Sequence, residues 1–223
     1  MADEILQCVE IDPQAQPSGV VIWLHGLGAD GHDFEPIVPE LKLPDSLPLR
    51  FVFPHAPRRP VTINQGMVMR AWYDILDLSL ERKVDIEHLL QSAGHLERLI
   101  TREIDAGMPS ERIVVAGFSQ GGAIALYTGL RYPQQLAGIL GLSTYMPTAA
   151  SLEEERSQAN RDTLVMMAHG TMDPLVPVHS GQAARDELKR LGYDVSWHTY
   201  PMAHQVCMEE IDEIGAWLRN VLG

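Results

Sequence analysis

Gly117-Phe118-Ser119-Gln120-Gly121 is the stretch that decides the fold of this chain, a G-x-S-x-G pentapeptide between two contrasting runs. The run before it, Ile113 to Ala116, is short and rich in β-branched residues, which predicts a buried strand. The run after it favours a helix up to Tyr132-Pro133, where a helix would stop. The glycines let the two backbones approach closely, so the turn would lift the Ser119 hydroxyl above the edge of a sheet. A glycine-rich turn with a helix-capping serine is the alternative interpretation of the pentapeptide alone.

A serine between a strand and a helix is typical of the nucleophile elbow of α/β-hydrolases. Its hydroxyl is a poor nucleophile at neutral pH, so this interpretation requires a histidine base and an acid that orients it. In this fold the chain order is Ser, then Asp or Glu, then His, each just past the carboxyl end of a strand. Asp173 follows the predicted strand Leu164 to Ala168 and meets this requirement. Asp162 precedes the same strand and Asp186 falls in a helical segment, so Asp173 is the predicted acid.

Nine histidines compete for the role of the base. Five of them precede Ser119 in the chain: His25, His32, His55, His88 and His95. Three others lie inside a predicted strand, at a predicted helix start or too close to a strand end: His198, His179 and His169. His204 follows the last predicted strand, Val195 to Tyr200, and precedes a helical run from Cys207 to Leu222. Its position makes His204 the predicted base.

Acyl transfer also needs two N–H donors for the negative oxygen of the tetrahedral intermediate. One is expected from Gln120, directly after the nucleophile. The other is expected from Leu27, in the glycine-rich loop that follows the predicted strand Val20 to Leu24. A dinucleotide-binding interpretation of Gly26-Leu27-Gly28 fails, because no third glycine falls at the required spacing. His25, in the same loop, is predicted to brace it by hydrogen bonding.

Several spaced motifs together resemble the family of acyl-protein thioesterases and small bacterial carboxylesterases. The resemblance runs from about residue 19 to the C-terminus and is carried by these blocks: His25-Gly26-Leu27-Gly28 with Asp30-Gly31 and Asp33-Phe34, Arg70-Ala71-Trp72-Tyr73-Asp74, Gly117 to Gly122, Leu142-Ser143-Thr144-Tyr145-Met146-Pro147, His169-Gly170 to Val176-Pro177, and Tyr200 to His204. It implies an α/β-hydrolase that cleaves carboxylic esters or thioesters, including lysophospholipids and acylated proteins. Ser119, Asp173 and His204 match the family's triad, and Leu27 and Gln120 match its oxyanion amides. The segment from Pro60 to Val68 would line the acyl channel.

The predicted mechanism is two-step hydrolysis of a short-to-medium acyl ester or thioester through an acyl-enzyme. Five apolar residues near the site are candidates for the substrate pocket, although each could equally pack in the core: Leu27, Trp72, Phe118, Met172 and Val176. The main role could be that of an acyl-protein thioesterase or a lysophospholipase. A dienelactone hydrolase would have cysteine in the elbow. A ligand-binding relative that has lost catalysis typically lacks a triad member, whereas all three are present here.

The chain of 223 residues is predicted to form one α/β-hydrolase domain, 1–223, with a mainly parallel sheet covered by helices on both faces. The clearest helix runs from Asp85 to Asp105 and carries one apolar stripe expected to face the core: Ile86, Leu89, Leu90, Ala93, Leu96, Ile100 and Ile104. The run Glu4 to Ile11 could add an antiparallel edge strand. No inserted segment after Ser119 is long enough for a large lid.

The net charge of −13 argues against a nucleic-acid partner, and it disfavours docking on an anionic membrane. No apolar run could span a bilayer and no signal peptide is evident, so stable membrane insertion is not expected. Cys8 and Cys207 are distant in sequence, which favours a reduced, cytoplasmic protein without disulfides. The histidines form no recognisable metal motif, so neither a metal nor another cofactor is predicted. A homodimer is compatible with the sequence.

Overall fold

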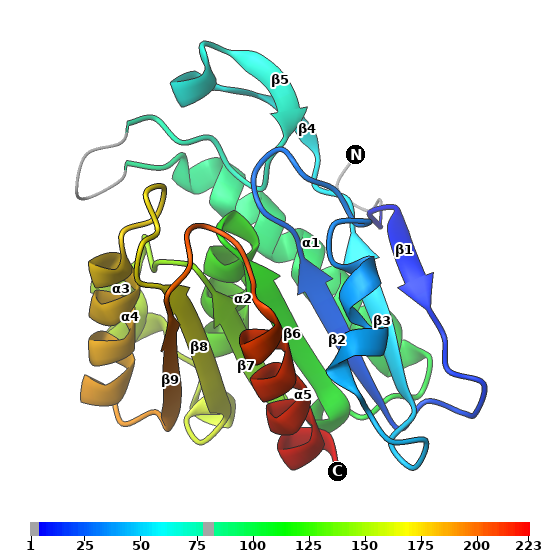
Figure 1. Ribbon diagram of the computed structural model, residues 1–223. Helices are drawn as coiled ribbons and strands as arrows, with labels where there is room; N and C mark the ends of the chain where they lie inside the picture. The colour runs from blue at the N-terminus through cyan, green and yellow to red at the C-terminus, as the bar shows by residue number, and fades with distance from the viewer. Residues whose placement is uncertain (1–4, 78–82) are drawn as a thin grey trace.

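A seven-stranded sheet forms the centre of the computed structural model, which describes residues 5–77 and 83–223 (Figure 1). In spatial order its strands are β1 (Cys8–Ile11), β3 (Leu49–Pro54), β2 (Gly19–Leu24), β6 (Ile113–Phe118), β7 (Gly138–Leu142), β8 (Leu164–Gly170) and β9 (Val195–Tyr200). All neighbouring strands are parallel except β1, which pairs antiparallel with β3. This sheet confirms the predicted α/β fold and the edge strand, although Glu4 lies outside the described residues.

Helices cover both faces of the sheet because its buried strands alternate their apolar side chains between two core layers. Val20 and Ile22 of β2 belong to the layer beneath four helices: α1 (Ile86–Asp105), α2 (Gln120–Arg131), α3 (Ala149–Glu155) and α4 (Val178–Arg190). Val21 and Trp23 belong to the opposite layer, which packs against α5 (Met208–Leu222) and two short 3-10 helices, η1 (Glu35–Ile37) and η2 (Pro39–Leu41). None of the helices within the described residues is long and apolar enough to cross a membrane.

The helix α1 confirms the helix predicted from Asp85 to Asp105, but it begins one residue later, at Ile86. Asp85 is the N-cap rather than a helical residue, and its side chain accepts a hydrogen bond of 3.0 Å from the His88 N–H. Most of the predicted stripe is buried, but Ile86 and Leu90 are 47% and 49% exposed. These two residues lie one turn apart at the flank of the buried face, and their side chains remain about half exposed to solvent.

A separate β-hairpin stands above the carboxyl ends of the central strands (Figure 1). It consists of β4 (Arg58–Val61), the 3-10 turn η3 (Thr62–Asn64) and β5 (Met67–Arg70), paired antiparallel. Two further 3-10 turns, η4 (Ser110–Arg112) and η5 (Gln158–Asn160), precede β6 and β8. Each connection after β6 holds only helices and short turns, so the described chain contains no lid domain there.

Candidate active site

Ser119 occupies the turn between β6 and α2, with backbone angles φ 55° and ψ −117° that few non-glycine residues adopt. The turn is so tight that two glycines are required. A Cβ on Gly117 would lie 2.3 Å from the carbonyl of Gly121, and a Cβ on Gly121 would lie 2.3 Å from the Leu24 oxygen. Thr144 Oγ1 donates a 2.7 Å hydrogen bond to the Ser119 carbonyl and braces the turn from β7. The elbow predicted from G-x-S-x-G is therefore present.

The structure brings Ser119, His204 and Asp173 together in one hydrogen-bonded line. His204 Nε2 lies 3.0 Å from Ser119 Oγ, and His204 Nδ1 lies 2.6 Å from Asp173 Oδ2. Because a carboxylate only accepts, Nδ1 carries the imidazole proton and Nε2 is left as an acceptor for the serine hydroxyl. The three side chains come from the loops after β6, β8 and β9, at the same edge of the sheet. This arrangement can activate the serine as a nucleophile.

The Asp173 carboxylate is held by its own loop. Its Oδ1 accepts hydrogen bonds from the Leu175 and Val176 N–H groups at 2.9 and 2.8 Å. Its Oδ2 lies 3.5 Å from Nε2 of His169, and that nitrogen donates a 2.8 Å hydrogen bond to the Val176 carbonyl. Burial lowers the pKa of His169 and keeps its ring neutral. The side chain excluded as a base thus supports the loop that carries the acid.

The two expected oxyanion donors are free to bind a substrate oxygen. Within the described residues, no hydrogen bond uses the backbone N–H of Leu27 or Gln120. The Gln120 N–H begins α2, where the first N–H groups of a helix have no intrahelical partner. Leu27 lies between Gly26 and Gly28, and Gly28 has a φ of 82° that a residue with a side chain rarely adopts.

Side-chain hydrogen bonds join the two loops that carry these donors. The buried Gln120 amide accepts from the Trp72 N–H at 3.0 Å and donates to the Tyr73 carbonyl at 2.8 Å. Trp72 Nε1 in turn donates to the His25 carbonyl at 2.8 Å. His25 accepts from the Ala56 N–H at Nε2, and burial lowers its pKa to about 4, so it is a neutral hydrogen-bonding residue. These contacts agree with a bracing role for His25.

A cavity of about 430 Å³ opens beside Ser119 and His204. Three of the five predicted pocket residues line it: Leu27, Phe118 and Val176. Trp72 and Met172 do not, and the prediction is corrected for both. Trp72 is only 1% exposed, and its buried indole donates to the His25 carbonyl, whereas Met172 is 62% exposed to solvent. Ile63 and Asn64 of the 60–68 segment also line the cavity. Four residues that the sequence analysis did not name as pocket residues complete the wall: Asp33, Ile75, Tyr145 and Leu175.

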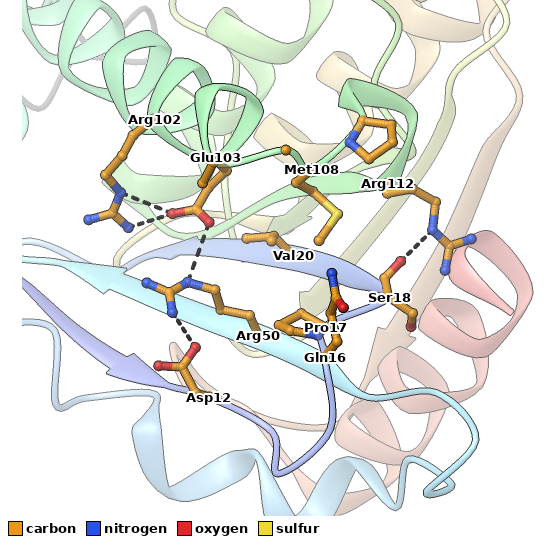
Figure 2. A pocket seen from close by; sticks show the side chains of 13 residues that line it. Asp12, Gln16, Pro17, Ser18, Val20, Arg50, Arg102, Glu103, Met108 and Arg112 are labelled. Carbon is orange, nitrogen blue, oxygen red and sulfur yellow. Dashed lines mark hydrogen bonds and ion pairs between the residues drawn. The ribbon is translucent and has the colours of Figure 1, made fainter.

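A larger hollow of about 730 Å³ lies away from these residues, near the start of β2. Figure 2 shows that its charged side chains bind one another: Arg50 pairs with Asp12 and Glu103, and Arg102 pairs with Glu103. The Arg112 guanidinium donates to the Ser18 and Leu222 carbonyls. Its lining contains neither a nucleophilic dyad nor an unpaired arginine within the described residues, so the smaller cavity beside Ser119 is the candidate active site.

Comparisons with known proteins point to one family. The phospholipase/carboxylesterase family matches residues 6–222. Acyl-protein thioesterase 1 of Gibberella zeae is 42% identical over 217 residues, which cover 93% of this chain and 92% of that protein. Acyl-protein thioesterase 1 of Mycosarcoma maydis is 40% identical over 235 residues and 98% of each chain. The crystal structure of Zea mays acyl-protein thioesterase 2 superposes with a TM-score of 0.87 at 31% identity, covering 97% of this chain and 99% of that one.

Proposed function

The chain belongs to the phospholipase/carboxylesterase family, and on that premise we propose that Ser119, His204 and Asp173 are the nucleophile, base and orienting acid of a serine hydrolase that cleaves carboxylic esters and thioesters. The observation that carries the proposal is the line of two hydrogen bonds, 3.0 Å from Ser119 to His204 and 2.6 Å from His204 to Asp173. A structural serine would need neither a neutral imidazole acceptor nor a carboxylate behind it.

In the proposed reaction, His204 takes the proton of Ser119 as the serine oxygen attacks the substrate carbonyl. The Leu27 and Gln120 amides bind the negative oxygen of the tetrahedral intermediate, and each contributes about 3 kcal/mol. The imidazolium then gives its proton to the departing alcohol or thiol. Water activated by the same imidazole hydrolyses the acyl-enzyme. Asp173 keeps the proton of His204 on Nδ1 and stabilises the imidazolium throughout.

The cavity supports a flexible, short-to-medium acyl chain as the substrate group. Its wall is mainly apolar, from Leu27, Ile63, Ile75, Phe118 and Val176. The 60–68 segment contributes Ile63 and Asn64, consistent with the channel role implied by the resemblance. Because its relatives are named acyl-protein thioesterases, the thioester of an acylated protein is the second substrate class we propose. Three further properties remain predictions from the sequence: a lysophospholipase role, a cytoplasmic location and a homodimer.

Replacement of the nucleophile tests the proposal. We expect a fluorophosphonate probe to label the protein once, and Ser119→Ala to lose both the label and turnover of a soluble aryl ester, with a loss on the order of 10⁶ in kcat. Ser143→Ala is the matched control, because Ser143 is also buried and also has a positive φ, 44°, at the end of the neighbouring strand. Label that persists in Ser119→Ala, or is lost in Ser143→Ala instead, would contradict the assignment.

A further inference from the structure

Asp33 stands out among the residues that line the active-site cavity. Among the described residues that line this cavity, Asp33 is the one with an Asp, Glu, Lys or Arg side chain. The reaction proposed above gives Asp33 no role. Asp33 is an exposed residue of this lining, and among residues 5–77 and 83–223 its carboxylate takes part in no hydrogen bond or ion pair. The nearby carboxylate of Asp30, in contrast, accepts a hydrogen bond from the His32 N–H. An unpaired negative charge therefore faces any molecule that enters.

Aromatic packing connects the backbone beside Asp33 with the ring of His204. The next residue, Phe34, is buried against Trp23, with ring centroids 5.2 Å apart, and against Phe118 at 5.6 Å. The Phe118 ring lies 4.7 Å from the His204 ring. Phe34 thus ties the backbone next to Asp33 to the Phe118 and His204 rings, and Asp33 and His204 line the same cavity. Ile63 and Ile75, which line the cavity with it, come from the hairpin and from the segment that follows β5.

The side next to His204 is where the leaving group must lie, because the imidazolium hands its proton to the departing oxygen or sulfur. Resting on the proposed function, we propose that Asp33 selects substrates by the charge of the leaving group. It favours alcohols and thiols that carry an ammonium or guanidinium group, such as an acylated cysteine flanked by lysine or arginine. It disfavours leaving groups that carry a carboxylate or phosphate.

The electrostatic surroundings support this selection. Desolvation, and then the negative charge of Asp30, raise the pKa of Asp33 above its ordinary value, so the ionised carboxylate gains from a cationic neighbour. The Asp30 pKa is lowered by its hydrogen bond from His32, which keeps a second negative charge close by. Among the described residues, Asp30 is the charged group that acts on Asp33, and Arg70 lies outside the lining with its guanidinium directed at the Ala56 carbonyl.

Three thioesters with one acyl chain and different leaving thiols test the proposal. The S-butyryl thioesters of thiocholine, 2-mercaptoethanol and 3-mercaptopropionate release a cationic, a neutral and an anionic thiol, respectively. A thiol reagent quantifies each released thiol. For Asp33→Asn we expect kcat/KM to fall about threefold for the cation and rise about threefold for the anion, from loss of one Coulomb interaction within a Debye length. The ratio of kcat/KM for the cationic thioester to kcat/KM for the anionic thioester would then fall on the order of tenfold. The kcat/KM of the neutral thioester should be unchanged.

Controls separate charge from structure. Asp33→Glu should keep the wild-type ratio, and Asp162→Asn removes an exposed carboxylate before β8, at the far edge of the sheet, and should leave the ratio unchanged. In the wild type alone the ratio should shrink as NaCl is raised. A ratio that moves less than twofold in Asp33→Asn and does not respond to salt would overturn the proposal, as would an equal change for all three esters. If wild-type protein cleaves none of the three, the proposed function fails instead.

Discussion

Replacing Asp173 by asparagine should reverse the tautomer of His204, and the structure shows why. Both loop N–H groups, of Leu175 at 2.9 Å and of Val176 at 2.8 Å, donate to the same oxygen, Oδ1. Only an acceptor can remain there, so the amide oxygen of Asn must take this place. Its NH₂ group then faces Nδ1 of His204, where Oδ2 now lies 2.6 Å away.

The consequence is a histidine that cannot act as a base. With an N–H donor opposite Nδ1, the imidazole accepts there and carries its proton on Nε2, directed at the Ser119 hydroxyl 3.0 Å away. The imidazolium of the transition state also loses its negative neighbour. We expect kcat to fall on the order of 10⁴, which corresponds to about 5.5 kcal/mol of transition-state stabilisation. Folding should change little, since the amide has the volume and hydrogen-bonding positions of the carboxylate.

The measurement is kcat and KM on a soluble aryl ester, together with a thermal unfolding curve for each variant. KM should stay close to that of the wild type, because the exchange does not touch the cavity wall. Asp162→Asn, the exposed residue just before β8, is the control and should be fully active. The reasoning is refuted if folded Asp173→Asn loses less than tenfold in kcat, or if Asp162→Asn is the crippling change.

Three further outcomes follow from particular contacts. Gly121→Ala places a Cβ 2.3 Å from the Leu24 oxygen, so we expect loss of about 1–3 kcal/mol of stability and of most activity, whereas Gly94→Ala, with nothing closer than 3.5 Å, should melt no lower than wild type. Burial raises the pKa of Glu210 from near 4.5 to about 8, so between these pH values the unfolded state loses this proton while the folded state keeps it. The free energy of unfolding should therefore fall as the pH rises through this range. In chemical denaturation, Glu210→Gln should abolish this part of the pH dependence. Turnover of soluble aryl esters should rise and then fall with acyl length, each methylene adding up to about 0.8 kcal/mol until the cavity ends. Activity that appears only on emulsified long-chain triglyceride would contradict this expectation, which rests on the lack of a lid domain in the described connections after β6.

The parts of the fold that the sequence predicts are those with a strong local signal. The buried runs of β2, β6 and β8 are continuous and apolar, and α1 has a clear stripe, so each could be placed to within a few residues. The β4–β5 hairpin has no comparable pattern. Its first strand contains Pro60, which sequence rules disfavour in a strand, and its turn depends on Gln65 and Gly66 in left-handed conformations. Such a segment is defined by pairing with its partner strand, which sequence periodicity does not report.

The candidate active site shows the same difference between residues with a strong local sequence signal and residues without one. Ser119, Asp173 and His204 follow strand ends, so the chain order and the edge of a parallel sheet were sufficient to bring them together. The cavity wall was harder, because proximity in sequence does not fix which way a loop side chain lies. Met172 precedes Asp173 directly, yet it is exposed to solvent, while Ile63 and Ile75 reach the cavity from more than 40 residues before Ser119.

The residue after the nucleophile shows how the oxyanion site could be kept rigid without a lid. In the proposed reaction the backbone N–H of Gln120 binds the substrate oxygen. Its side chain accepts a hydrogen bond from the Trp72 N–H and also donates one to the Tyr73 carbonyl. An amide can do both, whereas a carboxylate would face the Tyr73 oxygen with a second acceptor. Because Trp72 also donates to the His25 carbonyl, two residues before Leu27, the second oxyanion loop is tied to the same segment. Buried hydrogen bonds between residues almost 50 positions apart thus hold both donors in place before any substrate binds, which is the condition for strong electrostatic stabilisation of an oxyanion.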